Sequence, residues 1–222
     1  MKTRAVSGVP NPDCTALRDR IVAVARDRFF RYGFDRVTME EIARELGMSK
    51  KTIYRCFPDK TELIRSVARR IMEEFAAPVR ELMKDRELDF VAKLHGMMAI
   101  IGGRLQRVGP QAQHELLRAA PEVWREVEEF RRRNITENFG RLIQDGIAHG
   151  FVRTDVNPDI LVNIYLSATE SIVHPVRLVD FGISARDALE AVISVVFEGL
   201  LTSKGRSHLA AQHRRKKQKG KA

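Results

Sequence analysis

Residues 38–57 read TMEEIARELGMSKKTIYRCF, and this stretch decides the fold expected for the chain. Its apolar spacing predicts one short helix over 40–46 and a second over 50–56, joined by a minimal turn around Gly47. Thr38 is a good N-cap because Glu41 follows three positions later, which is the pattern of a capping box. Ser49 is an N-cap candidate for the second helix. The stretch therefore predicts a helix-turn-helix.

The faces of these two helices differ in character. At 100° per residue, Ile53 and Phe57 lie within about 40° of each other and must face the partner helix. The residues expected to pack inside are Ile42, Ala43, Leu46, Ile53 and Phe57. The residues then forced outward are Lys51, Thr52, Tyr54 and Arg55. Such a face suits the DNA major groove, where side chains contact phosphates and base edges.

The charge is unevenly distributed along the 222 residues. Residues 1–60 carry a net charge of +5, residues 61–203 carry −3, and residues 204–222 carry +8, within a total of +10. A polyanionic partner would therefore be met at the ends of the chain. No apolar run approaches the roughly 20 residues that span a bilayer, and residues 1–15 lack a signal-peptide pattern. We expect a cytoplasmic protein that has no membrane partner.

The rest of the chain also shows helical spacing, so the predicted fold class is all-α. Before the helix-turn-helix, a helix is expected from about Thr15 to Tyr32. The later helices are expected over 58–83, 87–107, 110–119, 121–149, 157–180 and 184–203. The expected domains are a flexible arm at 1–14, a DNA-binding domain at 15–62, a larger helical domain at 63–203 and a basic disordered tail at 204–222.

The sequence resembles the TetR family of bacterial transcriptional regulators. The resemblance is carried by RIVAVARDRFFRYGFDRVTMEEIARELGMSKKTIYRCFPDKTELI, residues 20–64, in which the spacing, the turn glycines and the aromatic-Pro-x-Lys junction match together. It covers about a fifth of the chain. It implies a regulator that binds double-stranded operator DNA as a homodimer and responds to a small-molecule effector.

The resemblance also implies which residues contact DNA. The contacts are expected from the third helix and from the starts of the second and fourth, at Thr38, Ser49, Lys50, Lys51, Thr52, Tyr54, Arg55 and Lys60. Two positions depart from the family pattern. Lys51 stands where many members have glycine, and Cys56 stands where a tyrosine or histidine is common. Cys56 is interpreted as a small flanking residue, with a redox switch beside DNA as the alternative.

By the same resemblance, the helical domain should bind the effector and hold the dimer. Apolar stripes on the last two helices are the dimer candidates: Leu161, Ile164, Ala168, Ile172, Leu189, Val192, Val196 and Leu200. A core within one chain explains these stripes equally well. The pocket candidates combine apolar residues with a few polar ones and predict a mostly apolar ligand: Met97, Ile101, Leu105, Leu117, Trp124, Phe130, Asn134, Asn138, Glu170 and His174.

No pattern of a catalytic, metal or cofactor site is found in the sequence. There is no HExxH, no G-x-S-x-G, no GxxxxGK[ST], and no cysteine at ligand spacing from a histidine. We therefore expect a regulator and not an enzyme, and we expect no cofactor. Among regulators, the preferred interpretation is a repressor that binds a near-palindromic operator. Two alternatives remain open: a helical ligand-binding protein or enzyme with a vestigial DNA module, and a nonspecific nucleic-acid-binding protein driven by the basic tail.

Overall fold

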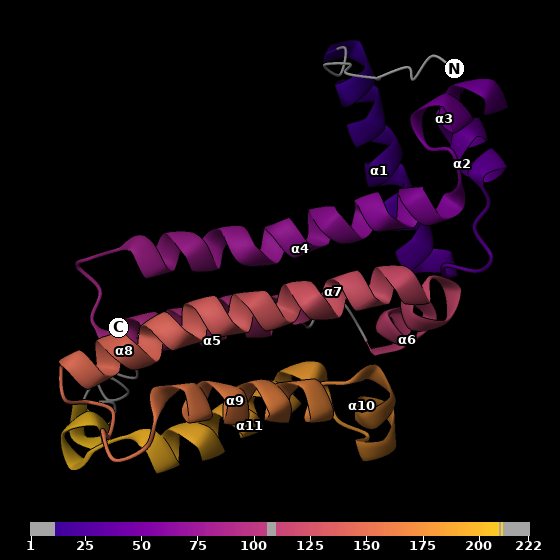
Figure 1. The fold of residues 1–222 in the computed structure, drawn as a ribbon. Helices are drawn as coiled ribbons and strands as arrows, with labels where there is room; N and C mark the ends of the chain where they lie inside the picture. Colours follow the sequence, from indigo (N-terminus) through magenta and orange to yellow (C-terminus); the bar gives the residue numbers. More distant parts are fainter. Residues whose placement is uncertain (1–11, 106–109, 209, 211–222) are drawn as a thin grey trace, which may run out of the picture. The chain divides into compact units, whose positions relative to one another are not determined.

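The computed structural model describes residues 12–105, 110–208 and 210, and these residues confirm the predicted all-α class (Figure 1). Within these ranges there is no β-strand, only an isolated bridge between Val152 and Leu201. The helices are α1 (Pro12–Tyr32), α2 (Met39–Glu45), α3 (Lys50–Cys56), α4 (Lys60–Lys84), α5 (Phe90–Leu105), α6 (Pro110–Ala119), α7 (Pro121–Asn134), the π-helical turn η1 (Ile135–Phe139), α8 (Gly140–Ala148), α9 (Pro158–Ile172), α10 (Pro175–Phe181) and α11 (Ala185–Leu200). None of the helices in the described residues is both long and apolar enough to span a bilayer.

The chain divides into two compact units. The first takes in the chain up to Arg70 together with Glu115–Val123, and the second takes in Ile71–His114 and the chain from Trp124 onward. The expected boundary at residue 62 lies within α4, whose residues are shared between the two units. The return of 115–123 to the first unit was not expected, because a helical pattern does not reveal which neighbour a helix packs against.

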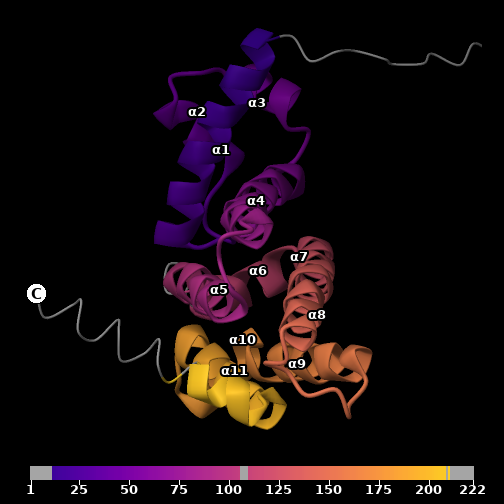
Figure 2. The same cartoon turned by 90° about the vertical axis from the view of Figure 1, so that its left-hand side faces the viewer.

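In the first unit, α2 and α3 pack against each other and against α1 (Figure 2). The turn between α2 and α3 places Gly47 at φ +64°, a left-handed conformation that glycine adopts without strain. The loop after α1 is closed by Phe34, whose ring stacks on Phe29 with centroids 5.1 Å apart. The core consists of fully buried apolar side chains, including Ile21, Ala25, Phe29, Ile42, Ile53, Phe57 and Leu63.

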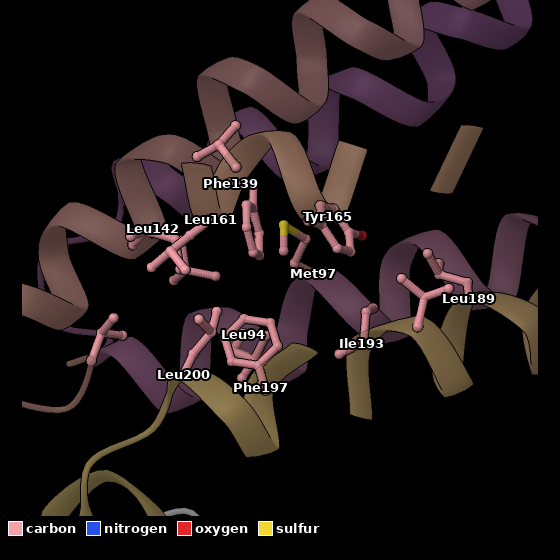
Figure 3. Close-up of a cluster of buried hydrophobic side chains, with 14 of the residues drawn as sticks. Leu94, Met97, Phe139, Leu142, Leu161, Tyr165, Leu189, Ile193, Phe197 and Leu200 are labelled. Atoms are coloured by element: carbon pink, nitrogen blue, oxygen red, sulfur yellow. The ribbon is translucent and has the colours of Figure 1, made fainter. Parts of the chain in front are cut away.

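The second unit is built around one apolar core formed by α5, η1, α8, α9 and α11 (Figure 3). Phe139 lies at its centre, stacked on Tyr165 with ring centroids 4.2 Å apart and meeting Phe197 edge-on at 5.7 Å. Burial raises the pKa of Tyr165 to about 12, so this phenol is neutral at physiological pH. Leu94 and Met97 of α5 complete this part of the core.

Two of the predicted long helices are interrupted in the structure. The helix expected over 121–149 runs as α7, η1 and α8, and its π-turn is accompanied by bonds from the side-chain amides of Asn134 and Asn138 to the carbonyls four residues earlier, both at 3.0 Å. The helix expected over 157–180 is two helices, because α9 ends at its cap Val173 and Pro175 begins α10. Neither a π-turn nor a complete break follows from apolar periodicity alone.

The chain after α11 is folded further than predicted. Residues 203–208 form a short helical segment, where the hydroxyl of Thr202 accepts a bond from Gly205 N and Arg206 donates to Leu201 O. His208 Nε2 lies 2.9 Å from Asp89 Oδ2. The start of the disordered tail predicted over 204–222 is therefore helical in the structure. Residues 209 and 211–222 lie outside the described residues, as does most of the predicted arm at 1–14.

Candidate DNA interface

The orientation of α3 is fixed by its buried side. Ile53 and Phe57 are completely buried, and the Arg18 guanidinium of α1 lies 4.2 Å from the centroid of the Phe57 ring. Arg18 also donates a hydrogen bond to the carbonyl of Cys56 at the end of α3. At the other end, Ser49 Oγ accepts the amide hydrogen of Thr52 at 3.1 Å. α3 is therefore capped at its start and held to α1 at its end.

The outward side of α3 carries the predicted groove residues. Lys51, Tyr54 and Arg55 are exposed, and Thr52 is partly exposed. Among the described residues, Lys51 and Arg55 make no ion pair with any carboxylate. Two uncompensated cations on one exposed helix face can bind phosphate oxygens and base edges without first breaking internal ion pairs.

Thr38, Ser49 and Lys60 have structural bonds in addition to their predicted DNA contacts. Thr38 and Glu41 form the complete capping box, in which Thr38 N donates to Glu41 Oε2 at 2.8 Å and Glu41 N donates to Thr38 Oγ1 at 3.2 Å. Lys60 Nζ donates to Asp35 O at 3.1 Å, and partial burial lowers the pKa of Lys60. These residues hold the ends of helices near the interface, and their side chains are exposed or partly exposed.

An acidic side chain, Glu40, lies beside the predicted interface. Its Oε1 is 3.2 Å from Lys50 Nζ and 3.5 Å from the Tyr54 hydroxyl, which donates to it. The pKa of Glu40 is lowered by a bond from its own backbone amide and by Lys50. The carboxylate thus remains ionised and is shared by two predicted DNA contacts. Sequence reasoning missed this residue because its partners lie on a different helix.

Cys56 lies in the core of the first unit. It is 2% exposed and forms no disulfide. A thiol that is closed off from solvent is a poor candidate for the reactive thiolate that a redox switch needs. Its position favours the interpretation as a small packing residue.

The predicted pocket residues fall into separate groups. Met97 and Asn138 are buried in or beside the core of the second unit, while Ile101 and Leu105 pack against that core. Leu117 belongs to the first unit. Phe130 and Asn134 are partly exposed on α7, and the amide nitrogens of both asparagines are occupied by backbone carbonyls.

One subset of the predicted pocket residues lies together. Trp124 and His174 meet edge to face with ring centroids 6.1 Å apart, and Arg131 lies over the same tryptophan. Glu170 is bound by Arg132, with 2.9 Å between Arg132 Nη2 and Glu170 Oε1. Arg131 was missed because a charged residue in a basic run is usually read as a solvated surface residue. Within the described ranges, no group of three or more His, Cys, Asp or Glu side chains is placed to hold a metal.

The predicted dimer stripe is mostly internal, which corrects that assignment. Four of its members are buried in the core of the same chain: Leu161, Leu189, Val192 and Leu200. Three pack partly against that core: Ala168, Ile172 and Val196. Ile164 alone of the predicted set is exposed, at 51%. Periodicity identifies a buried stripe without revealing whether the same chain or a partner buries it.

Comparison with known families agrees with this geometry. The family model for bacterial regulatory proteins of the tetR family matches residues 21–67, which cover most of α1, all of α2 and α3, and the start of α4. Residues 21–67 form a TetR-family helix-turn-helix domain. The chain is accordingly a helix-turn-helix transcriptional regulator with a DNA-binding function.

Similar proteins are also named as HTH-type transcriptional regulators. An uncharacterized HTH-type transcriptional regulator, YvaF of Bacillus subtilis, is 22% identical over 166 residues, which is 73% of this chain and 85% of YvaF. The uncharacterized HTH-type regulator Mb2274c of Mycobacterium bovis is 39% identical over 66 residues, which is 30% of this chain and 33% of that protein. The stronger identity is confined to a short part of the relative.

Solved structures of transcriptional repressors and regulators share the fold. SmeT, the repressor of the Stenotrophomonas maltophilia multidrug efflux pump SmeDEF, superposes with a TM-score of 0.65 at 16% identity, covering 86% of this chain and 93% of SmeT. A TetR/AcrR family regulator from Thermobifida fusca gives 0.63 at 21% identity, covering 83% and 98%. SmeT in complex with triclosan gives 0.61 at 18% identity, covering 85% and 93%.

The position of Glu40 generates a prediction for DNA affinity. Glu40→Gln should raise affinity for duplex DNA by roughly threefold to tenfold at low salt, because a carboxylate that competes for Lys50 and Tyr54 is removed. Fluorescence anisotropy with labelled duplex measures the change over a range of salt concentrations. Glu45→Gln is the matched control, since Glu45 lies on the same helix but pairs with Arg28 of α1. Weaker binding by Glu40→Gln would show instead that this carboxylate positions its two partners for DNA.

Proposed function

We propose that the chain is a homodimeric repressor that binds a near-palindromic operator and is released from it by a small, mostly apolar ligand. The observation that carries the DNA-binding part is the outward face of α3, where exposed Lys51, Tyr54 and Arg55 stand on a helix whose opposite side is buried. A helix presented in this way can enter the major groove. The cations supply affinity through phosphates, and side-chain contacts with base edges supply sequence preference.

The homodimer is supported by apolar side chains that the chain leaves exposed on α9 and α11. Ile160 and Ile164 are one helical turn apart on α9, and Val195 of α11 is 73% exposed. α9 and α11 pack together, so both helices can contribute to a bundle with the same two helices of a second copy. Small residues on the same outward sides, including Ser167, Ala191 and Ser194, allow close approach of helices.

The release by ligand is supported by the helical second unit and by the likeness to SmeT, which is described as a repressor and has been solved with triclosan. α4 contributes residues to both units, so a ligand that changes the preferred position of this helix can change the spacing of two α3 helices in the dimer. Release requires the ligand to bind the DNA-free arrangement more tightly than the DNA-bound one.

Selection of bound sequences from a random duplex pool at physiological salt tests the proposal. The intact protein should recover one near-palindromic motif, because a twofold dimer places two α3 helices about one DNA turn or a small multiple apart. The Tyr54→Ala, Arg55→Ala double variant should lose the motif, while Arg26→Ala of α1 serves as a charge control. If no motif is recovered and the double variant binds as well as the parent, α3 is not the reading helix.

The dimer contact generates a separate prediction. Ile164→Glu should convert the protein to a monomer in sedimentation velocity, because a glutamate buried without a partner in an apolar interface costs several kcal/mol. Gln144→Glu on the exposed side of α8 adds the same charge outside α9 and α11 and should leave the dimer intact. An unchanged dimer for Ile164→Glu would place the interface elsewhere.

A further inference from the structure

Arg131 of α7 occupies an unusual position for a guanidinium group. Its central carbon lies 5.7 Å from the centroid of the Trp124 ring, seven residues earlier on the same helix. Trp124 is the only tryptophan of the chain and is 2% exposed. On another side, the ring of His174, which precedes α10, meets Trp124 edge to face. Arg131 therefore belongs to a group of side chains drawn from two separate parts of the second unit.

No carboxylate of the described residues pairs with Arg131. Glu170 is the nearest candidate on α9, but its carboxylate is bound by the neighbouring Arg132 at 2.9 Å. Glu128, one turn earlier on α7, forms no salt bridge with Arg131 either. Glu128 and Glu170 act on the Arg131 guanidinium only through longer-range electrostatic attraction. Arg131 is partly buried, and this loss of hydration lowers the pKa of its guanidinium.

A desolvated guanidinium without a paired anion is costly, because five N–H donors and a positive charge have lost part of their hydration. The cation–π contact with the Trp124 ring offsets a part of that cost. The planar fork of donors remains available for a bidentate bond to an oxyanion. A position of this kind is destabilising in the empty protein and becomes favourable when an anion binds.

We propose that Arg131 is the anion-binding residue of the effector site, and that the effector is a small amphipathic carboxylate whose apolar part packs against Trp124. The inference rests on the proposed function, since it specifies the ligand class of the same second unit. A singly charged carboxylate fits better than a phosphate dianion because Glu128 and Glu170 add negative potential around the site. His174 lines the edge of the tryptophan and borders the apolar part of the ligand.

Because Trp124 is the single tryptophan, its fluorescence reports directly on ligand binding at this site. Fluorescence of Trp124 is titrated with alkyl and alicyclic carboxylates of six to twelve carbons, and in parallel with the matched primary amides and alkyl phosphates. At least one carboxylate should change the fluorescence saturably and bind about tenfold or more tightly than its own amide, as a charge-assisted hydrogen bond requires. If every carboxylate binds no better than its amide, the proposal is overturned. A preference for the alkyl phosphate would overturn the assignment of a carboxylate.

Variants at Arg131 separate a ligand-binding role from a structural one. Arg131→Met should abolish the preference for carboxylate over amide, and without ligand its melting temperature should equal or exceed that of the parent, because an unpaired desolvated charge is removed. Arg133→Met, an exposed arginine on the same helix, should retain the preference. If Arg131→Met melts well below the parent and Arg131→Lys restores stability without restoring the preference, Arg131 is a structural residue.

DNA selection on the same proteins distinguishes failure of the Arg131 site from failure of the proposed function. A chain that recovers a DNA motif but shows no carboxylate preference retains the proposed function and loses the Arg131 site. A chain that shows the carboxylate preference, lost in Arg131→Met, but selects no DNA motif retains the site and loses the proposed function.

Discussion

Burial of Ile53 and Phe57 is the constraint on which the DNA interface depends. Both side chains are fully enclosed between α3 and its neighbours, so α3 cannot rotate about its axis without exposing them to water. The cost of such rotation is a few kcal/mol for two large apolar side chains. With this side fixed, the intervening positions must face outward, and they carry Lys51, Tyr54 and Arg55. The arrangement of the interface therefore follows from the core beneath it.

The same region was the most predictable from sequence. The capping box at Thr38, the cap at Ser49 and the inward pair on α3 are local patterns, and each is present in the structure. Interactions between helices were not predictable in this way. Glu40 holds Lys50 and Tyr54 across the turn, and neither spacing nor composition indicates that contact.

Prediction was weaker in the second unit for two physical reasons. Apolar stripes on α9 and α11 indicate burial, but the core of a chain and the interface of a dimer need the same residue types. Leu161 and Leu189 were therefore predicted in the dimer interface, whereas both lie in the core of the chain. Polar residues on long helices were equally ambiguous. Asn138 is buried with its amide nitrogen bonded to its own helix, whereas Arg131, in a run of three arginines, is desolvated over Trp124. Only packing distinguishes these cases.

Photo-crosslinking tests most directly whether the outward face of α3 reads DNA. The chain has two exposed tyrosines in its first unit, Tyr54 on α3 and Tyr32 at the end of α1, with exposed fractions of 42% and 48%. Each is replaced in turn by a photoreactive phenylalanine analogue, and the protein is irradiated with the duplex recovered by selection. If the outward face of α3 reads DNA, position 54 should crosslink efficiently to DNA bases and position 32 should give no crosslink above background. Crosslinks from position 32 but not from position 54 would contradict this role of α3.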